Sequence, residues 1–378
     1  MNDRISLRNL TWEYEQIQDA LLPAMEKLMV EGSFINGIEV ERFEAAFASF
    51  TGAKYCVGVS SGTDALMIAL LSIGVRPGDE VITTALTFVA TIEAILHVGA
   101  VPVIVDVDKR GLIDPERIEE AITEKTKAIL PVHLYGIPCN MRRISAICKK
   151  HGLLLLNDAA QAHGTIAQGK ALGSIGNATC YSFMPAKTLG AFGDAGAIVT
   201  NDMHISDKAR RLRNHGRTDK YNFLEIGYCA RMDALQAVVL TTKLGHLADW
   251  IKKRREIALV YNETLEKNVF ELPSQNEKKQ DTNSYYVYPV ILRGEKANRD
   301  WLLTQLSLAG IETNIYYPQE IPAIESLKEK VTICGTVVNA QHIAKHVFAI
   351  PMNPSITVTM AKKIATTVNS LATSGDAF

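Results

Sequence analysis

The sequence predicts an α/β protein in which a large domain, built on a mostly parallel sheet, precedes a smaller α+β domain. Short β-rich runs alternate with helical runs over residues 55–158, which is typical of parallel strands joined by helices. Residues 153–156 are all leucine, and strands that are apolar on both faces lie inside a covered sheet. After Thr200 the alternation stops and a long helical stretch begins. We therefore expect a large domain at 1–245 and a small one at 246–378.

The large domain opens with two predicted helices. Residues 22–32 and 36–52 each end at a glycine, which favours a helix C-terminus there, and apolar residues recur at helical spacing in the second. The sheet follows, flanked by helices. We expect its strands at 55–59, 79–84, 101–107, 127–132 and 153–158, and the helices between them at 63–74, 88–100, 114–122 and 141–152.

The second domain is reached through a helical stretch over residues 232–268, for which we expect an interruption near Gly245. The remaining pattern suits a small α+β domain. It comprises strands in 285–292 and near 314–317, helices at 298–310 and 360–372, and a polar surface loop at 274–283.

The composition limits the kinds of binding partner that we expect. The 40 basic and 41 acidic residues give a formal net charge of −1, so no strong field attracts nucleic acid or an anionic membrane. The six cysteines lack zinc-ligand spacing, which indicates reduced thiols. Neither an apolar signal core nor a bilayer-length apolar run is present. We expect a cytoplasmic protein that acts on a small substrate.

A candidate phosphate site follows the first strand. Residues 60–66 read SSGTDAL, which places hydroxyl groups, Gly62 and Thr63 at the start of a helix. First-turn N–H groups have no intrahelical partner, and the helix dipole favours an anion there. An ordinary helix cap has the same residue types, so this segment alone leaves both interpretations open.

A candidate acidic site follows the leucine strand. Asp158 comes directly after the apolar run, at the edge where open α/β sheets bind ligands. A carboxylate buried there needs a cation or several hydrogen bonds, because burying an unpaired ion costs several kcal/mol. Gln161 and His163 are close enough in sequence to contact the same ligand, or to be satisfied core residues.

A single lysine, Lys187, lies among glycines and small residues in 182–200. A lysine whose pKa is lowered becomes an amine nucleophile that forms a Schiff base with an aldehyde. A phosphate site, an acid for a pyridinium and a lysine for an aldehyde are the three contacts that pyridoxal 5'-phosphate needs. Ser182 adds a hydroxyl for the phosphate, and Phe88 an apolar face for the ring.

The chain resembles the DegT/StrS family of sugar aminotransferases, within the fold-type-I pyridoxal-phosphate enzymes. The resemblance covers nearly the whole chain, and its ordered set of motifs is more specific than any one of them. These motifs are NGIEVERFEAAFASFTGA, GVSSGTDAL, PGDEVITTALTFVAT, DAAQAHG, SFMPAKTLGAFGDAGAIVTND, RNHGR and RMDALQA.

The resemblance implies a role for each candidate residue. Lys187 forms the Schiff base, and Asp158 pairs with the pyridine nitrogen. The other implied cofactor contacts are Gly62, Thr63 and Ser182 at the phosphate, Gln161 at the ring oxygen and Phe88 against the ring face. Some related proteins carry histidine in place of the lysine and dehydrate their substrate. The lysine here favours transamination, because its free amine can move a proton between substrate and cofactor.

One motif departs from the family pattern. Where the family usually has an asparagine that is thought to reach the cofactor phosphate of the neighbouring subunit, this chain reads GYCAR, with Cys229. A thiol is a poor hydrogen-bond donor, so this contact is in doubt, whereas Arg231 is retained. The resemblance implies a homodimer with shared active sites. His163 and Arg231 are the candidate substrate contacts.

The implied reaction moves an amino group from L-glutamate, leaving 2-oxoglutarate, to a keto sugar that is most often carried on a nucleotide. Its product would serve amino-sugar biosynthesis for surface polysaccharides or related compounds. The motif RMDALQA favours a keto group at C-3.

Several alternatives remain. The acceptor could be a free keto sugar acid or a cyclitol, or the fold could serve a non-catalytic sensor that binds the cofactor. A lyase or desulfurase would need a reactive thiol, for which Cys229 and Cys334 are candidates. His342 and His346 have helical spacing for a metal, but no third ligand is evident, so we predict no metal site.

Overall fold

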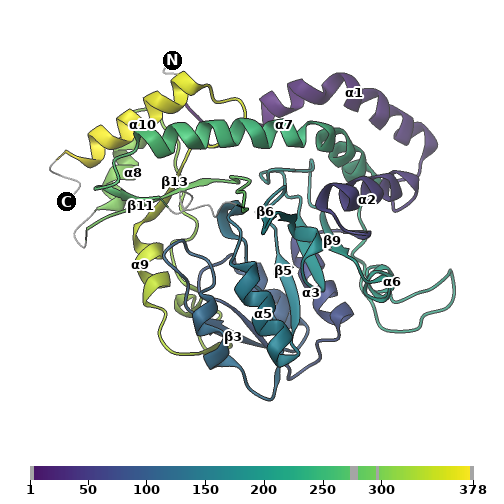
Figure 1. The fold of residues 1–378 in the computed structure, drawn as a ribbon. Helices are drawn as coiled ribbons and strands as arrows, with labels where there is room; N and C mark the ends of the chain where they lie inside the picture. Colours follow the sequence, from purple (N-terminus) through teal and green to yellow (C-terminus); the bar gives the residue numbers. More distant parts are fainter. Residues whose placement is uncertain (1–3, 273–279, 295–297, 375–378) are drawn as a thin grey trace.

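Two sheets of unequal size organise the chain (Figure 1). This computed structural model describes residues 4–272, 280–294 and 298–374, so most of the predicted polar loop, 274–279, lies outside the described residues. The larger sheet has eight strands in the order β1-β9-β8-β5-β4-β2-β3-β12. They are β1 (Tyr55–Val59), β9 (Gly196–Thr200), β8 (Ala178–Ser182), β5 (Leu154–Asp158), β4 (Thr126–Ile129), β2 (Glu80–Thr84), β3 (Val101–Val105) and β12 (Thr332–Ile333).

Most neighbours in this sheet are parallel. The pairs from β8 through β5, β4, β2 and β3 to β12 are all parallel, whereas β9 is antiparallel to both of its neighbours. The α/β prediction, a mostly parallel mixed sheet flanked by helices, is therefore confirmed. The leucine run supplies β5, which is buried after its first residue because strands lie on both sides of it and helices cover the sheet.

The helices begin and end at recognisable sequence signals. The first two predicted helices are α1 and α2, and the glycines that follow them, Gly32 and Gly52, adopt the left-handed conformation expected of C-caps. The first extends further toward the N-terminus than predicted. The α-helices are α1 (Leu10–Glu31), α2 (Ile38–Thr51), α3 (Gly62–Ile73), α4 (Ala90–His97), α5 (Met141–His151), α6 (Met203–Leu212), α7 (Ala234–Thr264), α8 (Arg299–Leu308), α9 (Val338–His346) and α10 (Val358–Ala372).

Helix α7 joins the two sheets and runs across one side of the molecule (Figure 1). The interruption predicted near Gly245 is wrong, because α7 continues for 31 residues. Its first half, including Leu247 and Trp250, packs into the core of the larger sheet, and from Ile257 onward it packs into a second core. A glycine inside a helix costs only about 1 kcal/mol, which tertiary packing on both cores readily offsets.

The smaller sheet contains β10 (Phe270–Glu271), β11 (Tyr288–Leu292) and β13 (Val347–Ile350), paired antiparallel. A further hairpin pairs β6 (Ile166–Ala167) with β7 (Lys170–Ala171). The strand expected near 314–317 is absent. Within this described segment the backbone makes single bridges, at Ile311 to Ile5 and at Asn314 to Ala349, so no ladder forms. The division of the chain at residue 245 stays a prediction, since α7 crosses it and β12 joins the larger sheet.

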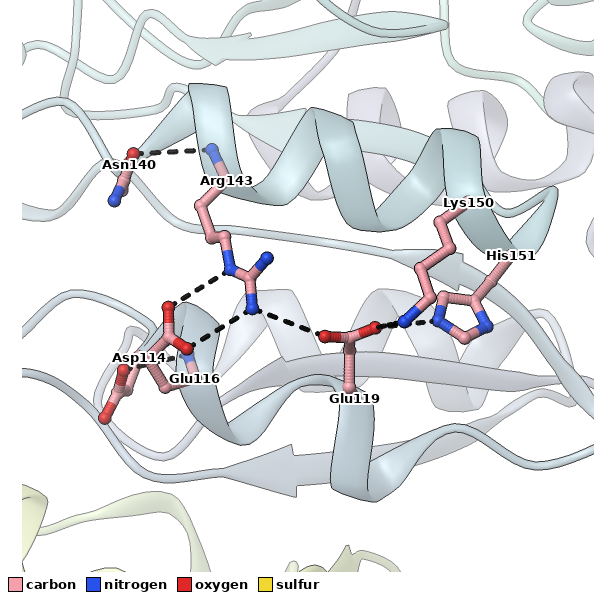
Figure 2. Close-up of polar contacts among 7 residues, drawn as sticks. All are labelled: Asp114, Glu116, Glu119, Asn140, Arg143, Lys150 and His151. Carbon is pink, nitrogen blue, oxygen red and sulfur yellow. Dashed lines mark hydrogen bonds and ion pairs between the residues drawn. The ribbon is translucent and has the colours of Figure 1, made fainter.

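The helix predicted over residues 114–122 is also wrong, since this segment forms two short 3₁₀ turns, at Pro115–Arg117 and Glu119–Ala121. Figure 2 shows how polar contacts join these turns to α5. Arg143 donates to Glu116 at 3.1 Å and to Glu119 at 3.4 Å, and Glu119 also pairs with Lys150 and His151. Hydrogen bonds from Lys150 and His151 lower the pKa of Glu119 to about 2. Surface pairs stabilise weakly, so this cluster fixes orientation more than stability.

None of the helices within the described ranges combines the length and the apolar character that crossing a bilayer requires.

Candidate active site

A cavity of about 650 Å³ lies where several parallel strands end. All residues that the sequence assigns to the cofactor line this one cavity, although they come from separate elements. They are Gly62, Thr63, Phe88, Asp158, Gln161, Ser182 and Lys187. Ligand sites commonly have volumes on the order of 300–1,000 Å³, so the cavity has room for a cofactor together with a substrate.

The N-terminus of α3 forms one end of the cavity. Ser61 caps the helix, because its Oγ accepts a hydrogen bond from the Asp64 N–H at 3.0 Å. The Ser60 and Ser61 hydroxyls donate to Asp64 Oδ2 at 2.6 and 2.7 Å. The N–H groups of Gly62 and Thr63 lie in the first turn and have no intrahelical partner. They are available to an anion in the cavity.

Backbone and side chain approach each other closely at this end. A Cβ atom on Gly62 would lie 2.5 Å from the Cβ and 3.0 Å from the Oγ of Ser182, at the end of β8. Such contacts are too short for real Cβ atoms, so only glycine fits at position 62. This close approach brings the Ser182 hydroxyl beside the free amides of α3.

Asp158 lies at the end of β5 and is only 5% exposed. Its Oδ2 accepts a hydrogen bond from Thr91 Oγ1 at 2.9 Å, and its Oδ1 accepts one from the Ala160 N–H at 3.0 Å. Burial raises the pKa of this carboxyl group, while the two hydrogen bonds and the positive charge of Lys187 act in the opposite direction. Within the described ranges no ion pair joins Asp158 to a cation, so the carboxylate can accept a cationic ligand.

Lys187 lies in the loop between β8 and β9, partly buried in the cavity wall. Burial lowers its pKa from 10.5 to about 8, the negative charge of Asp158 opposes this, and the positive charge of Arg8 adds to it. Its Nζ lies 4.8 Å from the centroid of the Tyr286 ring. A substantial fraction of the amine is therefore uncharged just above neutral pH, as a nucleophile or a base requires.

Two further predicted residues occupy the cavity wall. The Phe88 side chain is 55% exposed, and its ring lies 5.8 Å from that of Tyr317. Such an exposed aromatic face inside a cavity suits stacking on a planar ligand. Gln161 accepts a hydrogen bond from the Tyr135 N–H at 2.7 Å and donates one to the Tyr317 hydroxyl at 3.0 Å.

The sequence analysis missed several lining residues, because none belongs to a local motif. They come from the N-terminal segment and from the C-terminal part of the chain, and they are Arg8, Tyr286, Glu312, Asn314, Tyr316 and Tyr317. The pair of tyrosines at 316–317, followed by proline, is the one local signal that could have drawn attention to this region.

The structure does not place His163 on the cavity surface. Its ring is fully buried among Phe47, Tyr181 and Phe183, with centroid distances of 5.0 to 6.5 Å within this cluster. Burial, and secondarily the charge of Lys187, lower its pKa to about 3, so it is neutral at physiological pH. It supports the cavity wall from behind. A direct substrate contact by His163 remains a prediction that would require this cluster to open.

Arg231 also lies outside the lining of this cavity. It follows an exposed segment, and its Nη2 is 3.2 Å from the Cys229 sulfur. Cys229 is exposed and Cys334 is half-buried, and neither thiol lines the cavity. The rings of His342 and His346 lie 4.5 Å apart on α9 and are tilted by 39°, but within the described ranges no group of three metal-ligating side chains surrounds them.

Comparison with known proteins identifies the class of protein to which this cavity belongs. The family model for DegT/DnrJ/EryC1/StrS aminotransferases matches residues 15–369. The chain belongs to this family. It is therefore an aminotransferase, and its cofactor is pyridoxal 5'-phosphate. A solved structure that is 30% identical over 98% of this chain holds the amine form of that cofactor.

Individual relatives of this aminotransferase carry differing names. The chain is 41% identical to a "pleiotropic regulatory protein" of Geobacillus stearothermophilus, over 93% of this chain and 94% of the relative. It is 39% identical to a UDP-N-acetyl-3-dehydro-α-D-glucosamine 3-aminotransferase of Acidithiobacillus ferrooxidans, over 97% and 98%. The S. venezuelae DesV structure with a ketimine intermediate is 33% identical, covers 98% of this chain and 99% of its own, and has a TM-score of 0.94.

The cavity fits the family's cofactor on three observations. Asp158 is a buried carboxylate without an ion-pair partner among the described residues, as a protonated pyridine nitrogen requires. The glycine-dependent contact between Gly62 and Ser182 leaves free amides and a hydroxyl for a phosphate. Lys187 supplies an amine whose pKa lies near neutrality.

Proposed function

We propose that this aminotransferase moves an amino group from L-glutamate to the C-3 keto group of a nucleotide-linked sugar. The observation that carries the proposal is the convergence of Lys187, Asp158 and the N-terminus of α3 on one cavity. The names of several relatives support the acceptor, because they denote aminotransferases of UDP- or dTDP-linked sugars aminated at C-3. The product would be an amino sugar for surface polysaccharides or a related pathway.

We assign the binding of the cofactor to the residues predicted for it. Gly62, Thr63 and Ser182 hold the phosphate, and Asp158 keeps the ring nitrogen protonated. Phe88 packs against the ring face, and Gln161 contacts the ring oxygen. When bound, pyridoxal 5'-phosphate supplies an aldehyde that takes up the amino group and a ring that withdraws electrons from the reacting carbon.

Lys187 carries the acid–base chemistry in this proposal. Its Nζ would hold the cofactor, and the free amine of Lys187 would accept and return the proton that the transfer moves. A pKa of about 8 suits both steps, because a general base works best when its pKa lies near the operating pH.

We further propose a homodimer in the cytoplasm. Four large apolar side chains are exposed on the segment that precedes Arg231, namely Tyr221, Phe223, Leu224 and Ile226, the last at 95%. This segment projects from the rest of the molecule after α6 (Figure 1). A second copy that covers it would remove these apolar side chains from water. All six cysteines are unpaired, which supports a reducing compartment.

Two other functions have specific support. A non-catalytic sensor that binds the cofactor is favoured by the name of the Geobacillus stearothermophilus relative, a regulatory protein. The intact set of Lys187, Asp158 and the phosphate site argues for turnover instead. A free keto sugar acid or a cyclitol as acceptor would suit the same chemistry, with no need for a nucleotide contact.

An acceptor panel separates these functions. The cofactor-loaded protein is supplied with L-glutamate and a nucleotide-linked 3-keto sugar, the same sugar without its nucleotide, or a keto cyclitol, and 2-oxoglutarate is measured. We expect kcat/KM to be at least about 100-fold higher for the nucleotide-linked sugar, equivalent to roughly 3 kcal/mol of extra contacts. Transfer to the free sugar or the cyclitol alone would refute the proposal that the acceptor sugar is linked to a nucleotide. No transfer by the loaded protein would favour the sensor.

A further inference from the structure

The N-terminal segment brings a second cation into the active site. Ile5 pairs with Ile311, and the Leu7 N–H donates a hydrogen bond to Glu312 Oε2 at 3.0 Å. These contacts hold the segment beside the C-terminal part of the chain, so that Arg8 lines the cavity. Residues 5–8 therefore help to build the site.

Among the described residues, the Arg8 guanidinium donates hydrogen bonds to neutral oxygens alone. Nη2 donates to the hydroxyls of Tyr286 at 2.6 Å and Tyr316 at 3.0 Å, and Nη1 donates to the carbonyl of Ala186. The guanidinium carbon also lies 4.7 Å from the centroid of the Tyr286 ring. Across the described ranges no carboxylate forms an ion pair with Arg8. A partly buried guanidinium with only neutral partners favours an anionic ligand.

Arg8 lies close to the reacting centre. Its partner Ala186 directly precedes Lys187, and the Lys187 Nζ lies against the same Tyr286 ring, 4.8 Å from its centroid. An anion bound by Arg8 is therefore held near the atom that exchanges with the incoming amine. Arg8, Lys187 and Tyr286 all contribute to the surface of the cavity.

We propose that Arg8 binds the α-carboxylate of the amino-acid donor, an inference that rests on the proposed transfer from L-glutamate. In an amino acid the α-carboxylate is bonded to the carbon that carries the amine. A cation next to Lys187 is therefore suitably placed to bind that carboxylate. The diphosphate of a nucleotide sugar is several bonds away from a keto group at C-3. Both Nη2 hydrogens donate to tyrosine hydroxyls, so a carboxylate would accept from Nε or from the second hydrogen of Nη1.

The test measures binding without turnover. The aldehyde-loaded protein is titrated calorimetrically with 2-oxoglutarate, which has no amino group to transfer, and separately with UDP and dTDP. Arg8→Gln removes the charge but keeps hydrogen-bonding capacity, Arg8→Lys keeps the charge, and Arg4→Gln is the matched control because Arg4 is exposed in the same segment. Single-turnover reaction with L-glutamate gives the donor affinity independently.

We expect Arg8→Gln to weaken binding of 2-oxoglutarate and L-glutamate by on the order of 10- to 100-fold, the loss of one charge-assisted contact. Arg8→Lys should recover part of this loss, and Arg4→Gln and nucleotide binding should be unchanged. Unchanged donor affinity, a loss confined to the nucleotides, or equal losses for both ligand classes would each overturn the inference. If the wild-type protein bound 2-oxoglutarate but never accepted an amine, the proposed function would fail as well.

Discussion

The Cβ position of Gly62 lies 2.5 Å from the Cβ of Ser182, a distance that no real pair of side chains adopts. The contact joins the N-terminus of α3 to the end of β8, two elements that are far apart in the sequence. It brings free backbone amides and a hydroxyl to one point of the cavity. The phosphate site that we propose at this point therefore depends on the absence of a side chain.

Gly62→Ala should weaken cofactor binding by about tenfold or more, because relieving an overpacked contact typically costs 1–3 kcal/mol and here displaces α3 from Ser182. The measurement is a titration of the cofactor-free variant with pyridoxal 5'-phosphate. Gly245→Ala is the control, since no atom lies within 4 Å of the Cβ position in that exposed turn of α7. It should raise the free energy of unfolding by roughly 0.5–1 kcal/mol. Unaltered cofactor affinity in Gly62→Ala would contradict the assignment.

Asp158→Asn should lower the activity of the protein and raise the stability of its cofactor-free form. The rate of amine uptake from L-glutamate should fall on the order of a hundredfold or more, since the electrostatic partner of the ring nitrogen is lost. Burial raises the pKa of Asp158, so its charge destabilises the cofactor-free protein above the ordinary carboxyl pKa. The cofactor-free variant should therefore unfold at a higher denaturant concentration at pH 7. A variant that was less stable and equally active would refute both roles.

The pH dependence of cofactor capture reports on Lys187 directly. Burial lowers the pKa of this amine to about 8, and only the uncharged amine attacks an aldehyde. The rate at which the cofactor-free protein reacts with pyridoxal 5'-phosphate should rise about tenfold between pH 7 and 9 and then level off. In Asp158→Asn the profile should move to lower pH, because the Asp158 charge raises the pKa of Lys187. A rate that still climbed about eightfold between pH 9 and 10, as an amine with the ordinary pKa of 10.5 would give, would exclude a lowered pKa.

A buried ion pair fixes α1 on α7. Lys243 Nζ donates to Glu13 Oε2 at 2.8 Å, with the two side chains only 1% and 4% exposed. Lys243→Met should lower the free energy of unfolding by about 3–5 kcal/mol, because Glu13 is left buried without its cation. Glu13→Leu in the same protein should restore most of the loss, and Lys252→Met on the exposed face of α7 should change little. Denaturant unfolding curves of the wild type, Lys243→Met, the double variant and Lys252→Met measure these differences in stability. An unchanged free energy of unfolding in Lys243→Met would rule out a structural role for the pair.

The sequence was sufficient to predict five of the eight strands of the larger sheet, and the residues that it assigns to the cofactor meet in one cavity. Asp158 ends one of the predicted strands, and Gly62 begins the helix that follows another. These two placements follow from local patterns together with the rule that parallel strands present their carboxyl ends at one edge, whereas the strand that ends at Ser182 was not predicted. The residues meet because the elements that carry them end at the same cavity.

The substrate side could not be predicted in the same way. Arg8 reaches Tyr286 across 278 positions of sequence and Tyr316 across 308, and no local pattern encodes such contacts. His163 carries the residue type of a ligand contact, yet aromatic side chains enclose it. Which polar residues face the cavity is decided by packing between distant segments.

Local propensity misled the prediction at three points. The residues over 114–122 have helical character, but Pro115 and the capping Asp114 start a tight turn instead. The segment 314–317 has strand-forming residues but finds only single bridging partners. Gly245 resembles a break, yet α7 continues through it and packs into a core at each of its ends.

The visible absorption spectrum of the purified protein with added pyridoxal 5'-phosphate, recorded before and after L-glutamate, tests the central role of Lys187 most directly. We predict a Schiff-base band that appears with the cofactor and collapses when glutamate is added, and that is missing in Lys187→Ala although this variant stays folded. The exposed Lys170→Ala variant should behave like the wild type. A band that persisted in Lys187→Ala, or a wild-type protein that formed none, would contradict the account built on this lysine.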